Sequence, residues 1–200
     1  MYNKDMFFNL LLAILAFLIF AFLLIYSLWL IIPILSGLPW VPTSQHRIRK
    51  ALELARVQPG EVVYDLGSGD GRVLLTAVRD FGARAIGIEI SPLHCLAARW
   101  LARFNNLSDQ VSILRGDFYT ANLEEADVVF AFMTSVQAVR LRPTLPTRLR
   151  KGARVVTASF DFDGWLPTKI DQENLVFLYE MPPAPGSLGL YLEQKESMKP

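Results

Sequence analysis

One short segment carries residue types and a spacing that could do chemistry. Within Glu61–Arg72 an apolar run ends on Asp65, and glycines follow at positions 67, 69 and 71. Glycines let a ligand approach the backbone and allow dihedral angles that a side chain forbids. A helix predicted from Arg72 to about Phe81 follows at once, and its first N–H groups have no partner within the helix. The segment therefore predicts a ligand-binding turn between a strand and a helix.

The spacing of this turn distinguishes two classes of cofactor. A dinucleotide site requires G-x-G-x-x-G, in which the third glycine lets helix and strand pack closely. Arg72 stands where that third glycine is needed. Asp65 lies two residues before the first glycine, where its charge would repel a pyrophosphate and attract a cationic amino-acid group. A nucleotide site and a glycine-rich turn without any ligand are the alternatives.

The pattern Asp65-x-Gly67-x-Gly69-x-Gly71 resembles motif I of the class I S-adenosylmethionine-dependent methyltransferases. The resemblance implies that S-adenosylmethionine is the cofactor. It also implies that the residues of the turn bind this cofactor, namely Asp65, Gly67, Ser68, Gly69 and Gly71.

Further positions along the chain match the same family. Glu89 ends a predicted strand over 84–89, 22 residues after Gly67, and a carboxylate near this offset can accept hydrogen bonds from both ribose hydroxyls. Asp117 and Phe118 follow a third predicted strand, at about 111–114, and the resemblance places them against the adenine. Alternatively, Glu89 is a surface acid at a strand end, and Asp117 belongs to an ordinary turn.

The end of the fourth predicted strand, Ala126–Phe132, separates this chain from one class of methyltransferase. Amino-methylating DNA enzymes carry an Asn/Asp-Pro-Pro-aromatic run at this place, whereas this chain has Phe130-Ala-Phe-Met. The difference argues against methylation of a nucleobase amino group. These apolar side chains could form a wall near the transferred methyl group or belong to the ordinary core.

The remaining pattern predicts an α/β fold. Helix-like segments separate the first five predicted strands, the fifth at 153–160, and such alternation indicates a doubly wound, Rossmann-like sheet. We expect a sixth strand at 175–180 and a seventh at 188–193, which form a closing hairpin around a proline-rich turn. The prediction is thus a mostly parallel seven-stranded sheet with an antiparallel last strand, in a methyltransferase domain over 46–195 with a tail at 196–200.

The N-terminal segment predicts a transmembrane helix at about 10–32. No charged residue lies between Asp5 and His46. A helix of this length spans roughly 35 Å, enough for a hydrocarbon core of about 30 Å. A cleaved signal peptide would have a shorter apolar region followed by small residues. Pro33, Gly37 and Pro39 predict that the helix ends near Ile32, giving a membrane anchor over 1–36 and a linker, serving as a substrate and cofactor lid, over 37–45.

The flanking charges predict the orientation of a single-pass membrane protein. Only Lys4 precedes the apolar stretch, whereas Arg47, Arg49 and Lys50 follow it, which places the C-terminal domain on the cytoplasmic side. The single Cys95 fits a reducing compartment. No arginine-rich presequence is visible, which favours a prokaryotic cell membrane over the mitochondrial inner membrane.

Overall charge and ligand spacing limit the partners. The net charge of +1 gives no global attraction for nucleic acid, so none is expected as a partner, and no metal-ligand spacing occurs. A cluster of basic residues within 140–154, in a stretch without acids, could contact anionic lipids or form a solvated helix face.

A more specific resemblance rests on several segments together. The predicted anchor precedes Trp40-Val-Pro-Thr43, the motif over 63–72, Gly87-Ile-Glu89 and the aromatic run Phe160–Trp165. This combination resembles the membrane-anchored protein-lysine methyltransferases of the ATP synthase c subunit and the adenine nucleotide translocase, with their prokaryotic relatives. The resemblance implies a membrane-associated protein as substrate.

A lysine amine must be neutral to attack, and an apolar pocket favours its neutral form. The candidates for this acceptor pocket are Thr43, Phe132, Asp161, Phe162 and Trp165, each of which could instead be structural. Two other functions stay open: methylation of a lipid, quinone or other apolar small molecule, and a non-catalytic scaffold that binds the cofactor.

Overall fold

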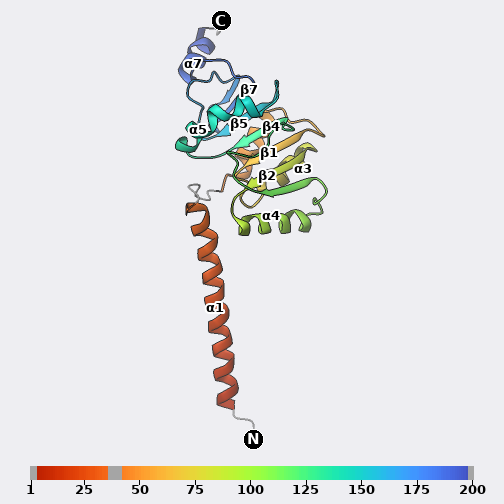
Figure 1. Cartoon of the computed structure of the whole chain (residues 1–200), viewed down its shortest axis with the longest axis vertical. Helices are drawn as coiled ribbons and strands as arrows, with labels where there is room; N and C mark the ends of the chain where they lie inside the picture. The colour runs from red at the N-terminus through yellow and green to blue at the C-terminus, as the bar shows by residue number, and fades with distance from the viewer. Residues whose placement is uncertain (1–3, 36–41, 198–200) are drawn as a thin grey trace. The chain divides into compact units, whose positions relative to one another are not determined.

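The computed structural model describes residues 4–35 and 42–197. The chain divides into two compact units, Met1–Trp40 and Val41–Pro200. The first contributes one long helix, and the second contributes an α/β domain, as the colour gradient of Figure 1 shows.

Helix α1 runs from Lys4 to Leu35, beyond both predicted ends. The expected stop near Ile32 comes too early, because the helix continues through Pro33 to Leu35. Its stretch Met6–Leu28 is long and apolar enough to cross a membrane, and none of its most hydropathic part is buried within the protein. Such uniform exposure of large apolar side chains is unusual in a helix that is surrounded by water.

The domain contains the predicted seven-stranded sheet, in the order β3-β2-β1-β4-β5-β7-β6. Strands β1 to β5 are parallel, and β7 runs antiparallel between β5 and β6. The strands are β1 (Val62–Leu66), β2 (Arg84–Glu89), β3 (Val111–Arg115), β4 (Val128–Ala131), β5 (Arg154–Ala158), β6 (Lys169–Asp171) and β7 (Val176–Glu180).

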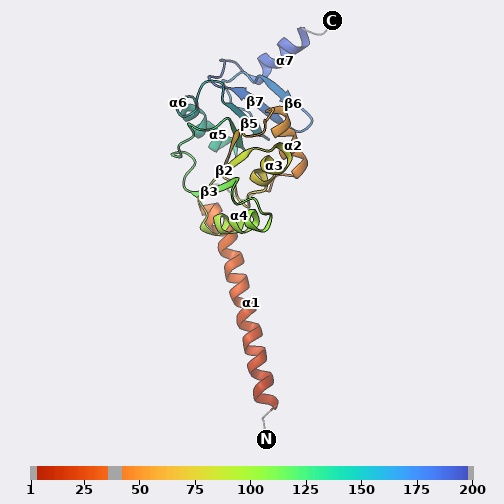
Figure 2. The same ribbon diagram turned by 90° about the vertical axis from the view of Figure 1, so that its right-hand side faces the viewer.

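Helices cover both faces of this sheet, and Figure 2 shows the layers from the side. On one face α2 (Gln45–Leu54), α3 (Arg72–Phe81) and α4 (Pro92–Phe104) pack on a shared apolar core. Between β4 and β5 lie α5 (Ser135–Leu141), the 3₁₀ turn η1 (Arg142–Thr144) and α6 (Leu145–Arg148), on the opposite face. Ser44 caps α2 by accepting a hydrogen bond from the N–H of Arg47 at 3.3 Å.

Two predictions about the last strands are wrong. The segment expected as a strand at 188–193 belongs to helix α7 (Leu188–Ser197), because Ser187 caps it by accepting the N–H of Leu190. The hairpin partner of β7 is instead β6, three residues at 169–171, too short for an alternating pattern to reveal. The predicted strands at 126–132 and 153–160 are also shorter in the structure, at Val128–Ala131 and Arg154–Ala158.

Candidate functional site

The turn after β1 has the left-handed backbone that its glycines predict. Gly67, Gly69 and Gly71 have φ angles of +84°, +52° and +81°, all in the left-handed region. The backbone N–H groups of Gly67 and Ser68 donate to the carbonyl of Ile88 at 2.9 and 3.1 Å. The turn is therefore fixed to the end of β2 by backbone hydrogen bonds.

Close packing against two neighbours explains part of the glycine requirement. A Cβ on Gly71 would lie 3.1 Å from the Cβ of Ala98 on α4, and one on Gly87 would lie 2.5 Å from Oγ of Ser68. Gly87 is a position that sequence reasoning left without a role. The sequence feature that could have revealed its role is a glycine inside an otherwise apolar strand. Such a glycine often marks a place where another part of the chain approaches the backbone closely.

Asp65 is the last but one residue of β1 and is only 3% exposed. Burial raises the pKa of its carboxyl well above the ordinary value, and the nearby carboxylates of Glu89 and Asp70 raise it further. No described residue donates a hydrogen bond to this carboxylate. The adjacent Oγ of Ser68 is also buried and without a hydrogen-bond partner. A buried acid and a buried hydroxyl that lack partners together fit a polar ligand with a cationic group.

Glu89 ends β2 beside this turn and is also buried. Its two carboxylate oxygens accept the backbone N–H groups of Gly69 and Ser91, each at 2.8 Å. Burial alone would raise the pKa of Glu89, but the imidazole of His94 and these backbone N–H groups outweigh burial and lower it. Nδ1 of His94 lies 3.8 Å from the carboxylate. Glu89 therefore stays ionised and couples the glycine turn to the start of α4.

Asp117 and Phe118 lie just beyond β3, at the edge where the parallel strands β1 and β2 also end. Asp117 is exposed, and its carboxylate accepts the N–H of Tyr119 at 2.9 Å, so the turn chemistry considered from the sequence is present. Phe118 is buried, and Arg148 donates to its carbonyl at 2.7 Å. The structure brings this pair to the same sheet edge as Asp65 and Glu89.

The aromatic run after β5 forms a compact cluster around Phe162. The ring centroid of Phe162 lies 4.8 Å from Trp165, 5.4 Å from Phe160 and 5.5 Å from Tyr179. Sequence reasoning missed Tyr179, a polar-tipped residue within the apolar strand β7. Its hydroxyl oxygen accepts the backbone N–H of Phe162 at 2.9 Å, and burial raises the pKa of this phenol. Phe162 is almost fully buried, whereas Trp165 is half-buried.

The other candidates for the acceptor pocket have fewer contacts with the aromatic cluster around Phe162. Thr43 is buried, and its carbonyl accepts a hydrogen bond from Nη1 of Arg72 at 3.2 Å. Phe132 and Asp161 are half-buried, and Phe132 packs against the core below the α2–α4 layer. Within the described part of the chain, no hydrogen bond or ring contact joins Thr43 or Phe132 to the aromatic cluster. The predicted Trp40 and Val41 lie outside the described residues.

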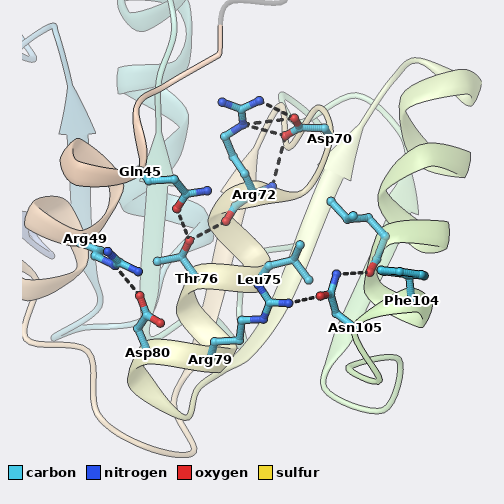
Figure 3. A pocket seen from close by; sticks show the side chains of 11 residues that line it. Gln45, Arg49, Asp70, Arg72, Leu75, Thr76, Arg79, Asp80, Phe104 and Asn105 are labelled. Carbon is cyan, nitrogen blue, oxygen red and sulfur yellow. Dashed lines mark hydrogen bonds and ion pairs between the residues drawn. The ribbon is translucent and has the colours of Figure 1, made fainter.

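A separate pocket of about 540 Å³ lies among α2, α3 and α4 (Figure 3). It includes Asp70 and Arg72 from the turn but neither Asp65 nor Glu89. Its polar side chains are engaged with one another: Arg72 pairs with Asp70 and Arg49 with Asp80, each at 2.6 Å. This pocket therefore adjoins the glycine turn through Asp70 but does not contain the two buried acids at the strand ends. Among the described residues no group of three or more His, Cys, Asp or Glu side chains could hold a metal ion.

Comparison with known proteins agrees with this geometry. A family described as "ANTKMT methyltransferase domain" matches residues 65–169. The chain belongs to this family. It is a methyltransferase, and S-adenosylmethionine is its cofactor.

The proteins to which this methyltransferase is similar carry names that differ in substrate. The chain is 36% identical to a protein-lysine N-methyltransferase of Saccharolobus islandicus (strain REY15A), over 70% of this chain and 92% of that protein. It is 31% identical to the adenine nucleotide translocase lysine N-methyltransferase of Mus musculus, over 74% of this chain and 68% of that protein. A crystal structure of an RNA methyltransferase from Salinibacter ruber with S-adenosylhomocysteine is 39% identical, with a TM-score of 0.69 over 71% of this chain and 94% of that one.

The turn of this methyltransferase fits its cofactor chemically. S-adenosylmethionine carries an ammonium group, a sulfonium and two ribose hydroxyls. The described chain offers a buried carboxylate that lacks a cation, at Asp65, and a buried hydroxyl that lacks a partner, at Ser68. Gly67 and Gly69 have no side chain that would block the backbone from the cofactor, whereas Gly71 packs against Ala98.

Proposed function

We propose that this methyltransferase is tethered to a membrane and transfers methyl groups to lysine side chains of a membrane-associated protein. The observation that carries the proposal is the match to a protein-lysine methyltransferase over 92% of that relative's length. Helix α1 adds an apolar stretch of 23 residues, Met6–Leu28, that is long enough to span a bilayer.

Each residue of the turn has a proposed role in binding the cofactor. Asp65 pairs with the ammonium group, and Ser68 follows beside it in the turn that holds the cofactor. The backbone at Gly67, Gly69 and Gly71 lets the cofactor approach closely. Glu89 accepts the ribose hydroxyls with lone pairs that its bonds to Gly69 and Ser91 leave free.

Asp117 and Phe118 would contact the adenine, since they lie beyond the next parallel strand at the same edge. Arg148, at the end of α6 in the β4–β5 connection, supports this contact because it donates a hydrogen bond to the carbonyl of Phe118.

When bound, the cofactor supplies an electrophilic methyl group on a sulfonium. The protein must hold the acceptor amine in line with it, neutral and shielded from water. Trp165, which is half-buried and packs on the buried rings of Phe162 and Tyr179, would provide an apolar wall that favours the neutral amine. Asp161 would attract the incoming ammonium before it loses its proton, and Thr43 and Phe132 would complete the pocket.

The proposed location is a single-pass protein with its domain on the cytoplasmic side of a prokaryotic cell membrane. Arg47, Arg49 and Lys50 follow α1 closely, and the positive-inside rule counts them whether or not they form ion pairs. The linker over 37–45 would serve as a lid, and the domain would extend over 46–195.

The test uses full-length protein in its own membranes with methyl-labelled S-adenosylmethionine. Asp65→Ala removes the proposed cofactor contact, and Asp109→Ala, at an exposed loop acid, is the matched control. We expect label in a protein band, recovered as methyl-lysine after hydrolysis, that is lost in Asp65→Ala and kept in Asp109→Ala. Label in the lipid or RNA fraction would replace the lysine proposal, and label in no fraction would favour a binding scaffold.

A further inference from the structure

The outer face of α4 carries an apolar stripe that no role in the methyl-transfer site explains. Leu96, Trp100 and Phe104 are 65%, 63% and 72% exposed. They recur every four residues, so they lie on one face of the helix. The rings of Trp100 and Phe104 stack with centroids 5.4 Å apart. The opposite face of α4, with Cys95, Ala98 and Ala102, packs on the sheet.

The charges on this face have one sign. Arg99 and Arg103 are exposed between the apolar residues, and the sequence of α4 contains no acid. Arg99 donates one hydrogen bond to the carbonyl of Ile113 at 2.7 Å. No ion pair with a described acid engages either guanidinium. Exposed aromatic and aliphatic side chains interleaved with arginines are typical of a helix that lies in the interface of an anionic bilayer.

The basic cluster over 140–154 does not offer such a face. Arg148 donates to the carbonyls of Phe118 and Ala121, and Arg150 pairs with Asp127. Arg154 pairs with Glu61 and donates to the carbonyl of Ala55 at 2.7 Å. These three guanidinium groups hold the domain together, Arg142 donates to the carbonyl of Asp163, and Arg140 lies over the ring of Tyr119. Of the cluster, Lys151 alone has no hydrogen-bond, ion-pair or ring partner among the described residues, so α4 is the better candidate for contact with lipid.

The length of the chain limits where the domain can go. Helix α1 ends at Leu35 and α2 begins at Gln45, so only residues 36–44 connect them. Nine residues reach at most about 30 Å. If α1 spans a bilayer, the domain stays within this reach of the headgroups. An apolar face held so close to a lipid surface meets it at a high effective concentration.

We propose that the α4 face, defined by Leu96, Arg99, Trp100, Arg103 and Phe104, docks on the surface of an anionic lipid bilayer. The proposal rests on the membrane tether of the proposed function, but not on the identity of the methyl acceptor. Both views show α4 along the outside of its layer (Figures 1 and 2). The N-terminal end of α4 follows Glu89 directly, so docking would set the distance between the cofactor-binding edge and the headgroups.

The test measures the fluorescence of Trp100 in full-length protein reconstituted into vesicles of phosphatidylcholine and phosphatidylglycerol. The difference between wild type and Trp100→Phe isolates the emission of Trp100, because phenylalanine keeps the face apolar. We expect lipids with brominated acyl chains to reduce this emission by about twofold or more, while acrylamide in the water has little effect. Emission quenched by acrylamide alone, or by neither quencher, would overturn the proposal in favour of a face in water or covered by protein.

A pair of variants confirms which face is responsible. Leu96→Ser with Phe104→Ser should abolish most of the quenching by brominated lipid and restore quenching by acrylamide. Val136→Ser with Val139→Ser, at exposed valines of α5, is the matched control and should change neither. Equal effects of both pairs would contradict the assignment. Carbonate extraction checks that α1 stays inserted, and the methyl-label assay above reports separately on the proposed function.

Discussion

Asp65 and Glu89 lie side by side at the ends of neighbouring strands, yet their carboxyl groups are shifted in opposite directions. The pKa of Asp65 is raised by burial and by Glu89, whereas hydrogen bonds keep the pKa of Glu89 below its ordinary value. Two acids with different partners therefore suit two parts of one ligand, a cation beside Asp65 and hydroxyl groups beside Glu89.

Asp65→Asn should weaken cofactor binding and stabilise the protein without cofactor. Loss of a charge-assisted contact of about 1.5–3 kcal/mol lowers affinity roughly tenfold to a hundredfold. The raised pKa of Asp65 means that the folded chain binds more protons than the unfolded chain above pH 3.8, so its stability falls as pH rises through this window. The amide removes that penalty. Calorimetric titration and the melting temperature at neutral pH test both effects, and a lower melting temperature would contradict the second.

Glu89→Gln should destabilise the domain by about 1–3 kcal/mol, because one backbone N–H at Gly69 or Ser91 loses its acceptor. The lowered pKa of Glu89 contributes stability that is present above 4.5 and is lost as pH falls through its folded value. Denaturant unfolding at neutral pH and again in mild acid measures this, and we expect the difference between the two proteins to shrink in acid. A constant difference would argue against the ionised carboxylate as the source.

At the scale of elements, the glycine turn fixes how α3 and α4 pack. Gly71→Ala should cost about 2 kcal/mol or more, since φ is +81° and the new Cβ meets Ala98. Gly60→Ala shares the left-handed φ without the crowding and should cost about 1 kcal/mol. Gly116→Ala has neither burden and should stay within about 0.5 kcal/mol of wild type. Urea unfolding of the three variants measures these costs. Equal costs for Gly71→Ala and Gly60→Ala would show that the contact with Ala98 is unimportant.

Tyr179→Phe tests the contact between β7 and the aromatic run. The substitution leaves the buried N–H of Phe162 without its acceptor, so we expect about 1–3 kcal/mol of destabilisation. If the aromatic cluster lines the acceptor pocket, the methyl-transfer rate should also fall at saturating cofactor. Tyr191→Phe, on α7, is the matched control and should affect neither quantity. Unchanged stability of Tyr179→Phe would show that another group satisfies this N–H.

The sequence could predict those parts of the molecule whose cause is local. The turn from Asp65 to Gly71 follows from glycine chemistry and from the apolar strand before it, and both are visible in one short segment. Strand β6 was missed because three half-buried residues carry no period, and α7 was misassigned because the cap at Ser187 outweighed an apolar alternation. The roles of Gly87 and Tyr179 depend on Ser68 and Phe162, partners distant in sequence that only the fold brings together.

At the scale of the whole molecule, the proposed role of α1 depends on a lipid bilayer around the helix. Leu18→Arg with Phe22→Arg places two cations in the middle of the apolar stretch, at about 3 kcal/mol each in a bilayer. We expect the protein to become extractable by alkaline carbonate, while Leu18→Ala with Phe22→Ala stays in the membrane pellet. Retention of the double arginine variant would show that α1 does not hold the protein in the membrane.

The buried, partnerless carboxylate of Asp65 also bears on the lifetime of the protein in a cell. A ligand that binds only the folded chain stabilises it by an amount that grows with ligand concentration. The form without cofactor additionally keeps the carboxyl group of Asp65 buried without a partner, which is unfavourable, so it opens more often and is more readily degraded by proteases. Cells short of methyl donor should therefore hold less of this enzyme, and its abundance would follow the donor supply without any dedicated regulator.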